Sequence, residues 1–124
     1  MINLVWVALG GAAGASLRYL VYLGMGRIAG GGYPWATMTV NVVGSLLMGV
    51  LVGWLMRRGG SGEHLRLLLG VGLLGGFTTF SSFSLDFALL WQRGDTGTAL
   101  GYALVSVAAC IAALFAGMVL VRGA

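Results

Sequence analysis

The sequence predicts an all-α integral membrane protein with four transmembrane helices. Of its 124 residues, 59% are hydrophobic and only 8% are charged, which is too few to cover the exterior of a soluble domain. Four apolar stretches each reach the length of about 20 residues that crosses a hydrocarbon core of roughly 30 Å. The connections between them are short, so we expect residues 1–124 to form a single four-helix transmembrane domain.

The spans are expected at about residues 3–23, 35–56, 65–91 and 98–121. The first lacks the positively charged segment that begins a signal peptide, so we interpret it as a retained span. Connections are expected over residues 24–34, 57–64 and 92–97, the first two of them rich in glycine. The seven arginines are scattered, with no basic cluster longer than Arg57-Arg58, so a nucleic-acid partner is not expected.

Small residues recur at every fourth position of the second span, which places them on one helix face. They are Thr37, Asn41, Ser45, Gly49 and Gly53. Such faces let helices approach closely in lipid, where no hydrophobic force drives association. Close packing explains the glycines, but it does not explain the amide of Asn41.

The distribution of arginines gives little preference for one orientation in the membrane. Both chain ends and the second connection share a side that holds Arg57, Arg58, Arg66 and Arg122. The other side holds Arg27 and Arg93, and Arg18 if it reaches that surface. This bias is weak under the positive-inside rule. Since four short helices cannot easily enclose a pathway alone, we hypothesise a dual-topology antiparallel homodimer.

The stretch GGFTTFSSFS at residues 75–84 predicts that the third helix is broken in mid-membrane. Glycine costs conformational entropy in a helix, and threonine hydroxyls compete for backbone bonds. Non-helical backbone at such depth requires burial by protein or a wet cavity, and its freed carbonyls can bind an alkali cation. Oxygen ligands without carboxylates favour a monovalent ion over Ca²⁺ or Mg²⁺. A kink filled by helix packing is the alternative.

Phenylalanines and polar groups alternate after this break. Phe80 and Phe83 share a face, which Phe87 continues, and the intervening positions are polar: Ser81, Ser82, Ser84 and Asp86. A lipid-facing phenylalanine stripe is the simpler interpretation, yet a polar cluster within a span indicates a functional site. The amide of Asn41, the hydroxyls, the phenol of Tyr102 and the positive ring edges could all solvate an anion weakly enough to release it. The hydroxyl oxygens could also serve a cation.

Two further residues each allow two interpretations. Arg18 either extends to the headgroups or raises the anion concentration at a vestibule. Cys110 either packs as a small hydrophobe or lines the pathway.

Three motifs together resemble the Fluc (CrcB) family of fluoride channels: GGAAGASLRY at 10–19, TMTVNVVGSLLMG at 37–49 and GGFTTFSSFS at 75–84. The resemblance implies an antiparallel homodimer in the bacterial inner membrane that carries F⁻ passively out of the cytoplasm and so protects against fluoride. It also implies a structural Na⁺ at the dimer centre, held by backbone carbonyls at the positions matching Gly75 and Thr78. Fluoride, a second copy of the chain and the lipid bilayer are the implied partners.

The resemblance further implies a set of pore residues. Phe80 and Phe83 match the pore phenylalanines, Asn41 matches the pore asparagine, and Arg18 matches an arginine near the vestibule. The hydroxyl track maps to Ser81, Ser82, Tyr102, Ser106 and Thr37. Three positions depart from the family pattern, because Cys110 replaces a serine, Ser82 a threonine and Asp86 a glutamate.

Two other classes remain open from sequence. Small multidrug exporters have four spans and dual topology, but they use a glutamate in the first span, where this chain has no acid. A non-transporting structural subunit would explain the glycine faces and leave the hydroxyl–phenylalanine cluster unexplained. No nucleophile–base pair or metal-ligand cluster is apparent, so we do not expect an enzyme.

Overall fold

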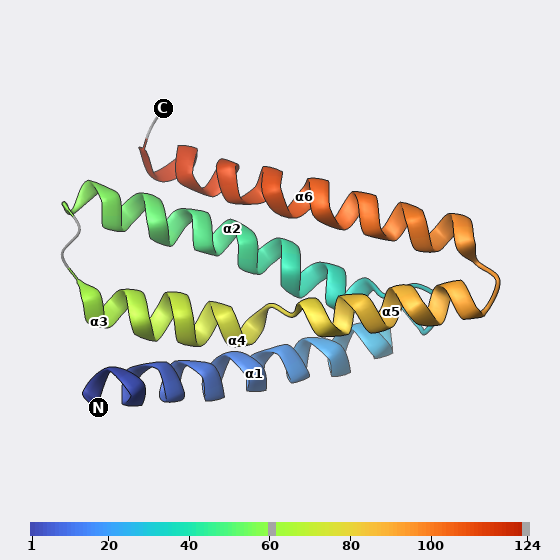
Figure 1. Ribbon diagram of the computed structural model, residues 1–124, viewed down its shortest axis with the longest axis horizontal. Coiled ribbons are helices and arrows are strands. Elements are labelled where there is room, and N and C mark those ends of the chain that lie inside the picture. The colour runs from blue at the N-terminus through green and yellow to red at the C-terminus, as the bar shows by residue number, and fades with distance from the viewer. Residues whose placement is uncertain (60–61, 123–124) are drawn as a thin grey trace.

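The computed structural model describes residues 1–59 and 62–122, so positions 60–61 of the second expected connection and 123–124 of the expected domain lie outside the described residues. Four helical rods lie side by side (Figure 1). The first two are α1 (Ile2–Ile28) and α2 (Trp35–Arg57). The third rod joins α3 (Glu63–Leu65), the π-helical segment η1 (Arg66–Leu74), α4 (Gly75–Phe77) and α5 (Phe80–Gln92), and the fourth is α6 (Thr96–Arg122).

All four rods are long and apolar enough to cross a membrane, which confirms the all-α membrane class. Each rod contains the span expected for it from the sequence. The start of α1, the end of α2, the start of α3 and the end of α6 lie at one end of the bundle, and the α1–α2 and α5–α6 connections lie at the opposite end (Figure 1).

The first helix extends further than the sequence suggested. The connection expected over residues 24–34 begins only after Ile28, because Gly24 and Gly26 are helical. The Ala29 N–H still bonds to the Met25 carbonyl, and Gly30 then turns the chain with a φ of +73°. A left-handed residue just beyond the helix is what ends it, and glycine adopts that conformation without strain.

The rods pack through backbone contact at glycines. A Cβ on Gly49 of α2 would lie 2.0 Å from the carbonyl oxygen of Leu114 in α6, and one on Gly117 would lie 2.2 Å from that of Leu46. The first and third rods meet similarly, since a Cβ on Gly14 would lie 2.0 Å from the Leu73 oxygen. These positions admit only glycine, so the small-residue faces act as helix-packing surfaces.

The third rod is interrupted at two threonines. Thr78 (φ −85°, ψ 159°) and Thr79 (φ −155°, ψ 121°) are both extended. Thr79 is the N-cap of α5, because its Oγ1 accepts a hydrogen bond of 3.2 Å from the Ser82 N–H. Figure 1 shows the resulting gap between α4 and α5 near the middle of the rod.

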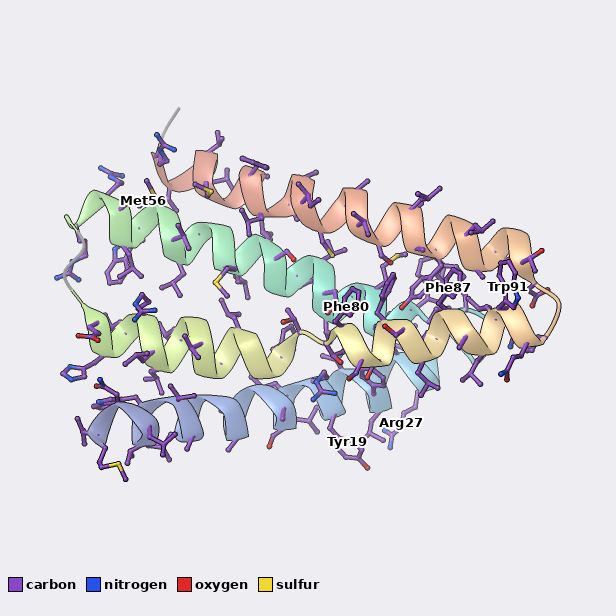
Figure 2. All side chains as sticks on the ribbon, in the orientation of Figure 1. Tyr19, Arg27, Met56, Phe80, Phe87 and Trp91 are labelled. Atoms are coloured by element: carbon purple, nitrogen blue, oxygen red, sulfur yellow. The ribbon has the colours of Figure 1, made fainter. Side chains whose placement is uncertain are left out.

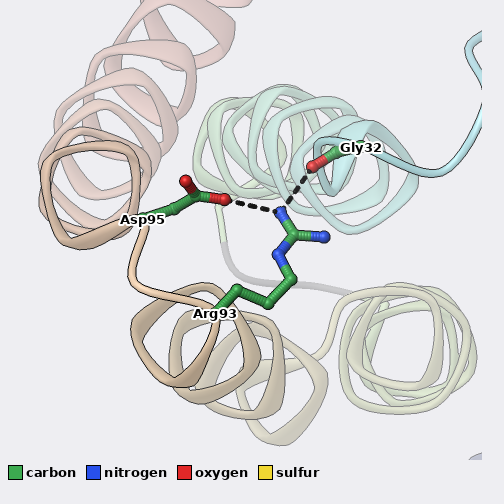
Figure 3. Close-up of polar contacts among 3 residues, drawn as sticks. All are labelled: Gly32, Arg93 and Asp95. Carbon is green, nitrogen blue, oxygen red and sulfur yellow. Dashed lines mark hydrogen bonds and ion pairs between the residues drawn. The ribbon is translucent and has the colours of Figure 1, made fainter.

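One arginine ties together the two connections at the far end of the bundle. Arg93 Nη2 donates to the Gly32 carbonyl at 3.0 Å and pairs with Asp95 Oδ2 at 3.1 Å (Figure 3). The linker from α1 to α2 is thereby held against the turn from α5 to α6. Because this pair is exposed, its contribution to stability is small, about 0–1 kcal/mol.

Candidate functional site

A groove of about 350 Å³ runs beside the break and is bounded by α2, the break, α5 and α6. It brings together half of the site residues expected from the sequence: Asn41, Thr78, Phe80, Phe83, Ser106 and Cys110. None of the described residues that line the groove is charged. Its polar groups are amide, hydroxyl, thiol and backbone.

Asn41 holds the interrupted backbone in place. Its Oδ1 accepts from the Thr79 N–H at 2.7 Å, and its Nδ2 donates to the Thr79 carbonyl at 3.0 Å. The amide of α2 therefore supplies both hydrogen bonds of one extended residue. A side-chain NH₂ has two donors, so one N–H of Asn41 remains for a further partner.

The break changes the partners of several carbonyl groups, and those of Gly75 and Thr78 can be followed directly. In an uninterrupted helix, the Thr79 N–H would bond to the Gly75 carbonyl and the Ser82 N–H to the Thr78 carbonyl. Here the first donates to Asn41 Oδ1 and the second to Thr79 Oγ1. The carbonyls of Gly75 and Thr78 therefore lose the amides that a helix would provide.

Arg18 of α1 forms a hydrogen bond to the backbone beside the same break. Its Nε donates to the Gly76 carbonyl at 3.1 Å, so the side chain of α1 bonds to the backbone of the third rod. From the sequence, Arg18 was expected either to extend to the headgroups or to lie at a vestibule. Its hydrogen bond to the Gly76 carbonyl was not predicted.

Aromatic rings form a continuous row along α5 and its neighbours. The ring centroids of Phe80 and Phe83 are 5.4 Å apart, and those of Phe83 and Tyr102 are 5.1 Å apart. Phe80 is 77% exposed in the single chain. Figure 2 shows it at the start of α5, on the side that faces α2 and α6. This row connects the groove to a second polar cluster.

The second cluster lies toward the end of the bundle that carries the α1–α2 linker. The Tyr102 hydroxyl donates to Asp86 Oδ2 at 3.2 Å, and the hydroxyls of Tyr22 and Thr37 are hydrogen-bonded to each other. Thr37 and Tyr102 are each 1% exposed. A cavity of about 170 Å³ reaches Tyr22, Thr37 and Asp86 from the linker. Burial raises the pKa of the Tyr33 phenol on its wall, so that group stays a neutral donor.

Among the other residues expected from the sequence, Ser81, Ser82 and Gly75 line neither cavity. Ser81 is exposed, with its hydroxyl 3.4 Å from Thr79 Oγ1, and Ser82 uses its backbone N–H to cap α5. Ser106 differs from both, because it lines the groove and is only 4% exposed. Its Oγ has no hydrogen-bond partner among the described residues.

The sequence matches the family described as "CrcB-like protein, Camphor Resistance (CrcB)" over residues 5–118. The chain belongs to this family. The CrcB family membership confirms the resemblance drawn from the three motifs. Several relatives are more than 50% identical to the chain over almost its whole length.

Three of these CrcB relatives are named "Fluoride-specific ion channel FluC". The protein of Mesorhizobium japonicum is 54% identical over 122 residues, which are 98% of each chain. That of Novosphingobium aromaticivorans is 56% identical over 99% of this chain and 98% of its own. That of Caulobacter vibrioides is 54% identical over 98% of this chain and 97% of its own.

Proposed function

We propose that this chain is a passive, fluoride-selective channel of the bacterial inner membrane, which lets F⁻ leave the cytoplasm and so protects the cell from fluoride. The observation that carries the proposal is the groove, which is lined by hydrogen-bond donors and aromatic rings and by no charged residue among those described. The names of the relatives specify the ion.

Fluoride is small and strongly hydrated, so a narrow path must replace its water with donors. The free N–H of Asn41 on α2 and the hydroxyl of Ser106 on α6, which has no partner among the described residues, are two such donors among the residues that line the groove. The edges of Phe80 and Phe83 add weak positive potential, because the aromatic quadrupole places positive charge there. Several weak sites in a row allow an anion both to enter and to leave.

A second copy of the chain is proposed to complete the path. The groove is open along one side of the single chain, and Phe80 beside it is 77% exposed. Gly75 at the break is exposed as well. The near balance of arginines between the two ends supports insertion in both orientations. We therefore propose an antiparallel homodimer of single-domain chains that meet at the break, in the middle of the membrane.

The break also fits a structural Na⁺. Two carbonyl groups per chain, those of Gly75 and Thr78, lose their helical amide partners because Asn41 and Thr79 take those amides. Freed carbonyls without carboxylates suit a monovalent cation. In the dimer, both copies would contribute carbonyls to one ion. Its charge would offset part of the cost of placing anions nearby, where water is scarce.

Reconstitution into liposomes tests the function directly. Liposomes loaded with fluoride or with chloride, and containing the purified chain, are diluted into a medium free of both, and efflux is followed with ion-selective electrodes. We expect rapid fluoride efflux that needs no pH gradient, and chloride efflux at the level of empty liposomes. Efflux driven by an imposed pH gradient would support a proton-coupled exporter instead, and no efflux of either ion would refute a channel.

A further inference from the structure

The groove contains two sulfur atoms to which the proposed fluoride conduction assigns no role. Cys110 of α6, the chain's single cysteine, is half-buried and lines the groove. Met48 of α2 lines it as well. Thiolate and thioether are soft ligands, which bind Cu⁺ and similar d¹⁰ cations in preference to hard ions such as Na⁺ or Mg²⁺.

A second observation indicates that a ligand binds at this place. Ser106 lies one helical turn before Cys110 and is 4% exposed, and its Oγ has no partner among the described residues. A buried hydroxyl without a partner costs free energy unless a bound group satisfies it. A lone pair of its oxygen can coordinate weakly to a cation held at the neighbouring sulfur.

The surroundings also tolerate a cation. No charged residue stands among the described residues of the groove wall, so no positive side chain repels it there. A volume of about 350 Å³ leaves ample room for a single metal ion.

We propose that Cys110 and Met48 form a binding site for a soft monovalent d¹⁰ cation, of the Ag⁺ and Cu⁺ class, and that its occupation blocks the fluoride path. Binding replaces the thiol proton, Cys–SH + Ag⁺ → Cys–S–Ag + H⁺, and the thioether provides the second ligand. The proposed cation binding depends only on the residues of the groove, whereas the proposed block of the fluoride path rests on the proposed fluoride function.

Silver bound by the purified protein tests the first half. The full chain in detergent is incubated with AgNO₃ in chloride-free buffer, and retained silver is measured by mass spectrometry after gel filtration. The variants are Cys110→Ser, which removes the soft ligand, and Met48→Leu, which keeps the volume. We expect Cys110→Ser to weaken binding by at least about tenfold, which is about 1.4 kcal/mol, and Met48→Leu to weaken it less.

Other sulfur atoms and His64 could hold silver weakly, and they would do so equally in every variant. Proton release in weakly buffered solution provides a second measurement, because metallation of the Cys110 thiol releases a proton that Cys110→Ser cannot release. Equal silver binding and equal proton release by wild type and Cys110→Ser would overturn the site.

Fluoride efflux from proteoliposomes tests the second half. The rate of each variant with Ag⁺ is compared with its own untreated rate, so differences in basal conduction do not matter. We expect Ag⁺ to lower wild-type efflux at least about tenfold, excess dithiothreitol to restore it, and Cys110→Ser to keep most of its rate. Silver-loaded wild type that conducts at its untreated rate would overturn the block. Untreated wild type that conducts no fluoride, yet binds silver through Cys110, would refute the channel function and leave the cation site supported.

Discussion

Replacement of Asn41 by aspartate is the sharpest test of the groove, because it changes one atom and adds one charge. The carboxylate keeps an acceptor for the Thr79 N–H but loses the donor that lies 3.0 Å from the Thr79 carbonyl. A part-buried carbonyl left without its donor costs about 1–3 kcal/mol. The new negative charge also borders the proposed path. At about 4 Å and an effective dielectric constant of about 20, it raises the energy of F⁻ by about 4 kcal/mol.

Since each 1.4 kcal/mol is a factor of ten, repulsion alone predicts fluoride efflux roughly 1,000-fold below wild type. The assay is initial efflux from liposomes, measured with a fluoride electrode at equal protein content. Gln92→Glu makes the same amide-to-acid change at the exposed end of α5, away from the groove, and is the matched control. Asn41→Asp efflux within about twofold of that control would refute the groove as the path.

Three further predictions use the same preparations. Phe80→Ile and Phe83→Ile remove the positive ring edges, and each should lower fluoride efflux by about tenfold. Unchanged efflux in both variants would show that the fluoride path lies elsewhere. Gly117→Ala places a Cβ 2.2 Å from a backbone oxygen of α2 and should lower the free energy of unfolding in detergent by about 1–3 kcal/mol. Gly101→Ala, with no described heavy atom within 4 Å, should instead raise it by up to about 1 kcal/mol, and equal effects would contradict the packing argument. Arg18→Lys keeps the charge but loses the planar donor to the break, so it should lower the unfolding free energy by about 1–2 kcal/mol; wild-type stability would show that this bond is unimportant.

The helices could be predicted from the sequence because hydropathy and residue spacing are local properties. The fourfold spacing that ends in Gly49 and Gly53 predicted a packing face, and α6 lies against it in the structure. The end of α1 was less predictable. Gly24 and Gly26 weaken a helix only slightly, and the left-handed turn at Gly30 depends on how the linker closes the bundle.

The residue types of the site could be predicted from the sequence, but the hydrogen bonds between them could not. The cluster after Gly75 indicated that backbone groups would be freed, whereas the bond from Asn41 to Thr79 spans 38 positions and follows from the packing of α2 against the third rod. Tyr22 gave no signal of its own, because a tyrosine near a helix end is ordinary until Thr37 is placed beside it. The partner of Asp86 was missed for the same reason, since Tyr102 reaches it from another rod.

The bonds made by Asn41 and by the Thr79 hydroxyl have a consequence for biogenesis. The backbone N–H groups at the interrupted helix donate hydrogen bonds to side chains of the same polypeptide. The N–H groups of Thr79 and Ser82 at the break are therefore hydrogen-bonded before any second copy is present. In the proposed antiparallel dimer, the insertion of each copy and the later encounter of the two copies in the bilayer can therefore proceed as separate events.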